Sequence, residues 1–200
     1  MRKIMFLLCL ALVSWGANAQ HDHAKMDHTK SGQSMMQSKM TGKMAISPAI
    51  KVEHSQSATA IINNYLALKD ALVEDNSKKA ASAGKMLFEA LSKFNLSAQS
   101  KSQQKELKDI IDDARENTEH IVENSGKIDH QREHFEILGT DIKDLIVITG
   151  SDRNLYQLYC PMYNNHEGGK WLSASNKVKN PFLGSKMLNC GNVKQEITVK

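Results

Sequence analysis

Cysteine is rare in this chain, with three residues in 200, and no two of them are spaced as C-x-x-C. Structural zinc sites are usually built from cysteines in such close pairs. Thioredoxin-like redox sites also need the C-x-x-C motif. The sequence therefore argues against a zinc site and against a thioredoxin-like oxidoreductase.

The short motifs of the common enzyme classes are also absent. The chain has no nucleophile elbow, no phosphate-binding loop and no H-E-x-x-H motif. Its neighbouring carboxylates, Asp112 with Asp113 and Asp141 with Asp144, are typical of solvated helix surfaces. We therefore expect that the protein is not an enzyme.

Long apolar runs are missing except near the N-terminus, where Phe6 to Val13 is too short to anchor a protein in a bilayer. This run follows the cations Arg2 and Lys3 and precedes the small-x-small motif Ala17-Asn18-Ala19. The three features together predict a secretory signal peptide over residues 1–19.

Cleavage near Ala19 would leave an exported, periplasmic protein without a membrane anchor. It would remove Cys9, which follows Leu8 rather than the small residue of a lipoprotein site, and would leave Cys160 and Cys190. Loss of the two leader cations lowers the net charge from +4 to +2. This charge is too small to indicate nucleic acid binding, and no basic stripe with interleaved aromatic residues is present.

Residues 20–52 predict a disordered tail, because Ser, Gly, Lys and Gln dominate and almost no aliphatic residue precedes Ile46. Such a segment cannot bury enough apolar surface to offset its chain entropy. The tail is nevertheless rich in histidine and methionine, which bind soft or borderline metal ions. Its candidate metal ligands are His21, His23, Met26, His28, Met35, Met36, Met40 and Met44.

Residues 53–150 predict a helical domain. Apolar residues recur with the 3.6-residue period in four runs, which are Ala58 to Leu72, Ala80 to Phe94, Leu107 to Val122 and Ile128 to Ile146. Short polar connections between the runs indicate an antiparallel four-helix bundle.

Residues 151–200 predict a small cap, rich in loops and strands and packed on the bundle. Short strands are expected near residues 155–159, 170–172 and 196–199. A segment of this size would not be stable alone. The predicted fold class is therefore mainly α, with a four-helix bundle, a small C-terminal cap and a disordered N-terminal tail.

The most specific functional pattern lies in the cap, where Cys160-x-Met162 is mirrored by Met187-x-x-Cys190. Thiolate and thioether are soft ligands that select Cu(I) or Ag(I) over hard cations. The remaining candidates for this metal site are His166 and Trp171. A tryptophan ring face attracts cations and would also shield the metal. A disulfide between the two cysteines, with the other residues only filling the core, is the open alternative.

Three histidines form a weaker pattern. His130 and His134 are four residues apart and share a helix face, and His120 would face them from the preceding helix. A divalent metal site and ordinary half-buried histidines both fit this spacing, so the sequence assigns them no role.

The C-terminal residues also carry a family resemblance. They are, in order, Tyr159-Cys160-Pro161-Met162, Trp171-Leu172-Ser173, Asn180-Pro181-Phe182, Gly184, Met187 and Cys190-Gly191. This order resembles a periplasmic domain family of unknown function, found alone or fused to adaptor subunits of Cus-type copper/silver efflux pumps. The segment Tyr65 to Val73, and Gln131-Arg132 with Phe135, are similar to its first and fourth helices. The resemblance covers about residues 55–197.

The resemblance implies copper or silver handling outside the cytoplasm, with an efflux adaptor or pump as the expected partner. The chain lacks the long β-rich and coiled-coil segments of an adaptor, so we expect a stand-alone relative. The leading prediction is a periplasmic Cu(I)/Ag(I)-binding protein that sequesters the metal or delivers it as a metallochaperone. One alternative is an interaction domain with a Cys160–Cys190 disulfide that docks on an efflux or sensor partner. A cuprous oxidase is disfavoured, because the chain lacks the histidine clusters it would need.

Overall fold

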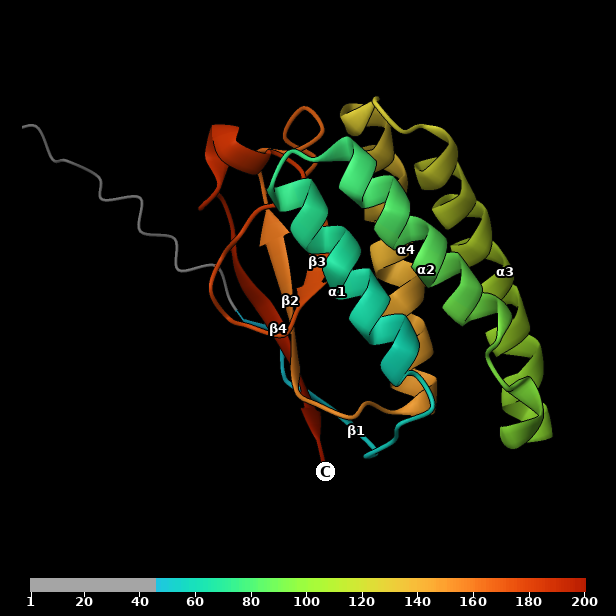
Figure 1. The fold of residues 1–200 in the computed structure, drawn as a ribbon. Helices are drawn as coiled ribbons and strands as arrows, with labels where there is room; N and C mark the ends of the chain where they lie inside the picture. The colour runs from blue at the N-terminus through green and yellow to red at the C-terminus, as the bar shows by residue number, and fades with distance from the viewer. Residues whose placement is uncertain (1–45) are drawn as a thin grey trace, which may run out of the picture. The chain divides into compact units, whose positions relative to one another are not determined.

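The computed structural model describes residues 46–200, and Figure 1 shows their fold. The expectation of a mainly helical chain with four helices and a small C-terminal sheet is confirmed. The elements are β1 (Ile50–Val52), α1 (Thr59–Val73), α2 (Ser77–Ser92), α3 (Lys101–Glu123), α4 (Ile128–Thr149), β2 (Leu155–Cys160), β3 (Gly169–Ser173) and β4 (Asn192–Val199). The expected signal peptide and residues 20–45 of the expected tail lie outside the described residues. Within residues 46–200, no helix is long and apolar enough to cross a membrane.

The four helices pack side by side in chain order, α1 on α2, α2 on α3, and α3 on α4 (Figure 1). Each buries the apolar stripe that its 3.6-residue period predicts. Gly84 on α2 allows α3 to approach closely, because a Cβ atom there would lie 3.1 Å from Val122 Cγ2.

The strands form one mixed sheet in the order β1-β4-β2-β3. β2 runs antiparallel to both β3 and β4, whereas β1 pairs in parallel with β4. Residues 50–52 were expected in the tail, and this part of the prediction is wrong. Ile50 pairs with Ile197, so the strand owes its existence to a partner at the other end of the chain, which local composition does not reveal.

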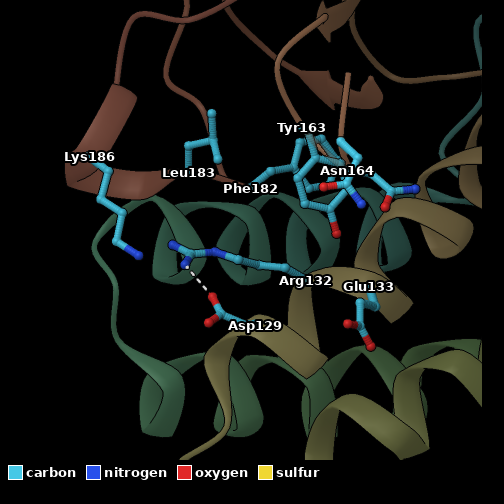
Figure 2. Close-up of a pocket in the computed structure, with 9 residues that line it drawn as sticks. Asp129, Arg132, Glu133, Tyr163, Asn164, Phe182, Leu183 and Lys186 are labelled. Atoms are coloured by element: carbon cyan, nitrogen blue, oxygen red, sulfur yellow. Dashed lines mark hydrogen bonds and ion pairs between the residues drawn. The ribbon is translucent and has the colours of Figure 1, made fainter. Parts of the chain in front are cut away.

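A buried arginine joins the helices to the C-terminal segment (Figure 2). Arg132 on α4 is 3% exposed, and its Nε donates to the Pro181 carbonyl at 2.8 Å. Its Nη2 donates to the Leu72 carbonyl at the end of α1 and to the Asp75 carboxylate. The Ser185 N–H and the Arg132 guanidinium together lower the pKa of Asp75 to about 2. Two separate segments are thus held against α4 by one side chain.

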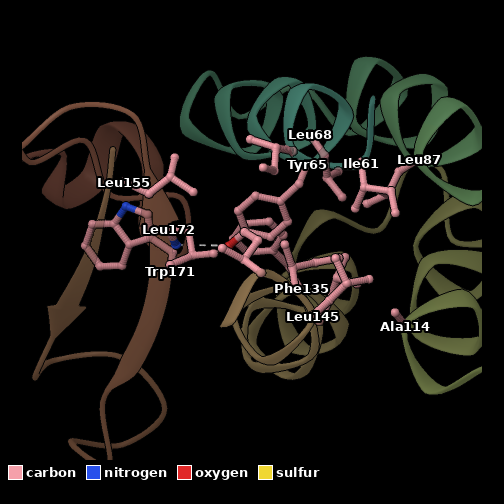
Figure 3. Close-up of a cluster of buried hydrophobic side chains, with 14 of the residues drawn as sticks. Ile61, Tyr65, Leu68, Leu87, Ala114, Phe135, Leu145, Leu155, Trp171 and Leu172 are labelled. Carbon is pink, nitrogen blue, oxygen red and sulfur yellow. Dashed lines mark hydrogen bonds between the residues drawn. The ribbon is translucent and has the colours of Figure 1, made fainter. Parts of the chain in front are cut away.

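The sheet meets the helices at Tyr65 (Figure 3). The hydroxyl of this buried tyrosine on α1 accepts a hydrogen bond from the Leu172 N–H of β3 at 3.1 Å. Its ring stacks on Phe135 of α4, with 5.1 Å between the ring centroids. Gly139 of α4 leaves room for this contact, because a Cβ atom there would lie 3.2 Å from the Lys170 carbonyl oxygen. The sheet therefore packs directly on α1 and α4.

Replacement of Arg132 by methionine should be strongly destabilising. The Arg132→Met variant leaves the Pro181 and Leu72 carbonyls and the Asp75 carboxylate without their donor. Urea unfolding should therefore show a free energy of unfolding that is lower by about 3 kcal/mol or more. Arg115→Met is the matched control, because Arg115 and its partner Asp112 have half-exposed side chains. The control should lose less than about 1 kcal/mol. Equal losses in the two variants would contradict the structural role given to Arg132.

Candidate metal site at the cysteine pair

The two cysteines meet at one end of the central strand pair. Cys160 is the last residue of β2, and Cys190 lies two residues before β4 begins. Because Tyr159 pairs with Asn192, the antiparallel register brings both cysteines to the same edge. Their Sγ atoms are 2.7 Å apart, with Cys160 fully buried and Cys190 half-buried. The structure thus brings the two cysteines together, whereas the metal site predicted from them stays a prediction.

The backbone around Cys190 is held by a buried asparagine. Asn180 Nδ2 donates to the Cys190 carbonyl at 2.8 Å, while its Oδ1 accepts from the Phe182 and Leu183 N–H groups. The Cys190 N–H donates to the Met187 carbonyl at 2.9 Å. Asn180 was part of the sequence motif, but the sequence did not predict a role for it. Its amide hydrogen-bonds backbone groups that come together only when the chain folds.

Gly191 permits a close approach behind the cysteine. Its φ of 139° lies in the region that favours glycine, and a Cβ atom would lie 3.0 Å from the Trp171 ring and 2.8 Å from the Tyr159 carbonyl oxygen. Any larger residue would push β4 away from β2 and separate the thiols.

The thiol of Cys190 is poorly acidic. Burial and the neighbouring Cys160 thiol raise its pKa to about 11, against an opposing hydrogen bond from the Met162 N–H. The Cys190 thiol is therefore protonated near neutral pH and slow to react as a nucleophile. A metal ion that binds here has to displace protons, so its affinity rises with pH.

The distance between the sulfur atoms is longer than a disulfide bond and shorter than the separation of two thiolates on one metal ion. A disulfide bond measures about 2.0 Å, whereas two thiolates at about 2.3 Å from one tetrahedral metal ion would be about 3.8 Å apart. The observed 2.7 Å requires the sulfurs to close for a disulfide or to open for a metal.

The two methionines flank the cysteines with their side chains in solvent. Met162 is 44% exposed and Met187 is 42% exposed. Met162 follows the cysteine of β2 through Pro161, and Met187 belongs to the short 3-10 helix Gly184–Met187. The backbones of both methionines contact Cys190, since the Met162 N–H and the Met187 carbonyl each hydrogen-bond it.

The other cap candidates lie in different surroundings. Trp171 on β3 is 1% exposed, and its ring packs edge-on against Phe182 with centroids 5.8 Å apart. Trp171 is therefore part of the core beside Gly191, which agrees with the alternative that it only fills the core. His166 lies in the exposed turn between β2 and β3, with a left-handed φ of 74°. The candidate ligands of the tail, from His21 to Met44, lie outside the described residues.

The three histidines do come together across α3 and α4. The His120 and His134 rings stack with centroids 4.5 Å apart, and the His130 ring meets His134 edge-on at 4.8 Å. His134 Nδ1 hydrogen-bonds Asn117 Oδ1, and burial with the neighbouring histidines lowers the His134 pKa. Stacked rings do not point their nitrogens at one common point. In the part of the chain that is described, no group of three His, Cys, Asp or Glu side chains is arranged to hold a metal ion.

A cavity of about 310 Å³ lies between the N-terminal turn of α4 and the segments that carry the two methionines (Figure 2). Tyr163 and Phe182 stack on one side of it, with centroids 4.3 Å apart. Asp129, Glu133 and Lys186 supply charges of both signs. The sequence did not indicate this cavity, because its walls come from three separate parts of the chain.

The described residues define a mainly helical domain with a small mixed sheet and, at the end of two of its strands, a cysteine pair of which one member is buried. Residues 61–154, which cover most of α1 and the whole of α2 to α4, match a protein family described as a protein of unknown function, DUF3347. The matched residues end before the cysteine pair, so the match supports the helical part of the domain. No curated protein and no solved structure matches the chain.

Alkylation should reveal the raised pKa of Cys190. In the reduced protein, the rate of Cys190 modification by iodoacetamide should still rise about tenfold per pH unit between pH 8 and 10, since the thiolate fraction grows until the pH reaches the pKa. Peptide mass spectrometry would measure the rate at this residue. In Cys160→Ser the rate should level off at lower pH, because one cause of the raised pKa is gone. A plateau near pH 9 in the wild type would contradict the burial argument.

Proposed function

We propose that the protein is an exported, periplasmic Cu(I)- or Ag(I)-binding protein that sequesters the metal or delivers it to an efflux adaptor or pump. The single observation that carries the proposal is the convergence of Cys160 and Cys190, whose Sγ atoms are 2.7 Å apart, between two exposed methionines. Two thiolates and two thioethers are a donor set suited to soft monovalent metal ions. The metal is cargo in this proposal, and the protein is not an enzyme.

Binding at this site would begin at the exposed side. Met162 and Met187 are exposed, and a thioether can bind the ion without losing a proton. The thiols then lose their protons to solvent as the metal–sulfur bonds form, and the sulfur atoms move apart to accept the ion. The Met162 N–H, which donates to Cys190 Sγ, favours the thiolate during this exchange.

The first described residues support a role for the tail in metal capture. The Ser47 N–H donates to the Lys194 carbonyl at 2.7 Å, and Lys194 is four residues from Cys190 along the chain. The His- and Met-rich tail is thus covalently joined to the domain beside the strand that follows Cys190. Ligands joined covalently to a site through a short connection reach an effective concentration of the order of millimolar, which favours transfer by ligand exchange.

Consecutive helices that pack side by side and are joined by short connections support the antiparallel bundle as the proposed arrangement of α1 to α4.

The alternative function is an interaction domain in which Cys160 and Cys190 form a disulfide. It is favoured by the short sulfur–sulfur distance in a compartment where disulfides persist. The exported protein would then be two hydrogens lighter by intact mass spectrometry and would carry no metal.

An anaerobic Cu(I) titration of mature, reduced protein against a chromophoric Cu(I) chelator tests the proposal. The wild type should hold one tight Cu(I) ion, and Cys160→Ser/Cys190→Ser should lose it, because serine hydroxyls are hard, protonated donors. Met162→Leu/Met187→Leu should weaken the site by about tenfold or more. Met86→Leu is the matched control, since Met86 on α2 is also exposed at 53% and should change nothing. Equal binding by the wild type and the cysteine variant would refute the site.

Deletion of residues 21–44 distinguishes the contribution of the tail to metal binding from that of the cysteine site. The shortened protein should bind fewer Cu(I) ions in total but keep the tight one, since weak histidine and methionine ligands are lost and the thiols remain. Its rate of Cu(I) uptake from a weak chelator should fall. The separate roles proposed for the tail and the cysteine site are refuted if the deletion also abolishes binding of the tight ion.

A further inference from the structure

A second cavity, of about 300 Å³, lies between α1 and the loop that follows β3, away from the residues assigned to metal. Its lining is strongly basic and rich in hydroxyl groups. The residues are Leu66, Lys69, Asp70, Ser173, Ala174, Ser175, Lys177 and Lys179. The site therefore holds three ammonium groups and one carboxylate.

The lysines differ in how they are held. The Lys69 side chain is 8% exposed, and its Nζ lies 2.7 Å from Asp70 Oδ1, so one cation of the lining is buried and paired. Lys177 and Lys179 make no ion pair with any carboxylate among residues 46–200. The positive charges of Lys177 and Lys179, which are exposed, are thus uncompensated, and the one carboxylate of the lining is already paired with Lys69.

Two serine hydroxyls add directional donors. Ser173 Oγ accepts from the Ser175 N–H at 3.1 Å, and Ser175 Oγ accepts from the Lys177 N–H at 3.2 Å. Each hydroxyl accepts through its oxygen in these bonds and keeps its own proton for a further acceptor. These bonds also hold the loop in the conformation that lines the cavity.

We propose that this cavity, named here the lysine pocket, binds the phosphate group of a small anion. Point-like ammonium groups around hydroxyl donors suit a tetrahedral oxyanion. A planar carboxylate is better matched by the fork of an arginine, and no arginine lines the cavity. Neither ammonium nor hydroxyl groups bind a soft metal ion, so this site is independent of the proposed copper function.

An adjoining cavity of about 410 Å³ has room for the rest of such a molecule. It shares Asp70 and Lys179 with the lysine pocket. Its own charges cancel, because Lys79 Nζ pairs with Glu74 Oε2 at 2.8 Å. A phosphomonoester would thus place its phosphate among the lysines and its organic part over the neutral neighbour, whereas inorganic phosphate would fill only the first cavity.

Nuclear magnetic resonance titration of the full mature protein tests the proposal. Inorganic phosphate and glycerol 3-phosphate, each added at constant ionic strength against chloride, should give saturable shifts of the backbone amides of residues 173–179. Tighter binding of glycerol 3-phosphate than of phosphate would identify an ester as the better ligand, and equal binding would identify the free anion. The Lys177→Gln/Lys179→Gln variant should bind at least about tenfold more weakly.

Lys101→Gln/Lys105→Gln is the matched control. These two exposed lysines lie on α3, and their substitution removes the same net charge at a place away from the lysine pocket. It should bind phosphate as the wild type does. The proposal is overturned if the shifts are linear with anion concentration, or if both variants lose the same affinity, since either result describes general charge attraction. Unchanged Cu(I) binding by Lys177→Gln/Lys179→Gln would show that the variant is folded and that the two sites are separate.

Discussion

The buried guanidinium of Arg132 is the interaction on which the C-terminal part of the domain depends. It joins the end of α1, the Asp75 carboxylate and the Pro181 carbonyl to α4. A cation removed from water is stable only when its donors are satisfied, so these segments have to stay where they are. Asn180, next to Pro181, in turn holds the carbonyl of Cys190. The position of one thiol of the pair is thus linked to a charge on the fourth helix.

The cysteine pair combines two opposing properties. Burial and mutual contact keep the Cys190 thiol protonated, which protects it from adventitious chemistry. The same closeness places two soft donors within reach of one ion, and Met162 and Met187 lie exposed beside them. A site of this kind would discriminate by the softness of the incoming ion, because only strong metal–sulfur bonds repay the loss of the thiol protons.

The helical part was largely predictable because its signal is local. The period of apolar residues in α1 to α4 is the same whether or not the helices are packed. β1 was not predictable, since Ile50 is stabilised by Ile197 at the far end of the chain. The roles of Arg132 and Asn180 were equally hidden, because both act on carbonyl groups that no sequence pattern specifies. The closeness of His120 to His134 followed from spacing, whereas the stacking of their rings did not.

The sequence alone determined the helical segments, the candidate soft ligands and their mirrored order, because residue type and spacing are properties of the chain. The tertiary structure decided which of these candidates meet. It brought Cys160 and Cys190 together through the pairing of β2 with β4, and it placed Trp171 in the core. It also assembled the lysine pocket from α1 and the loop after β3. The physical reason is that strand register and buried hydrogen bonds act between residues distant in sequence, so their partners exist only in the folded chain.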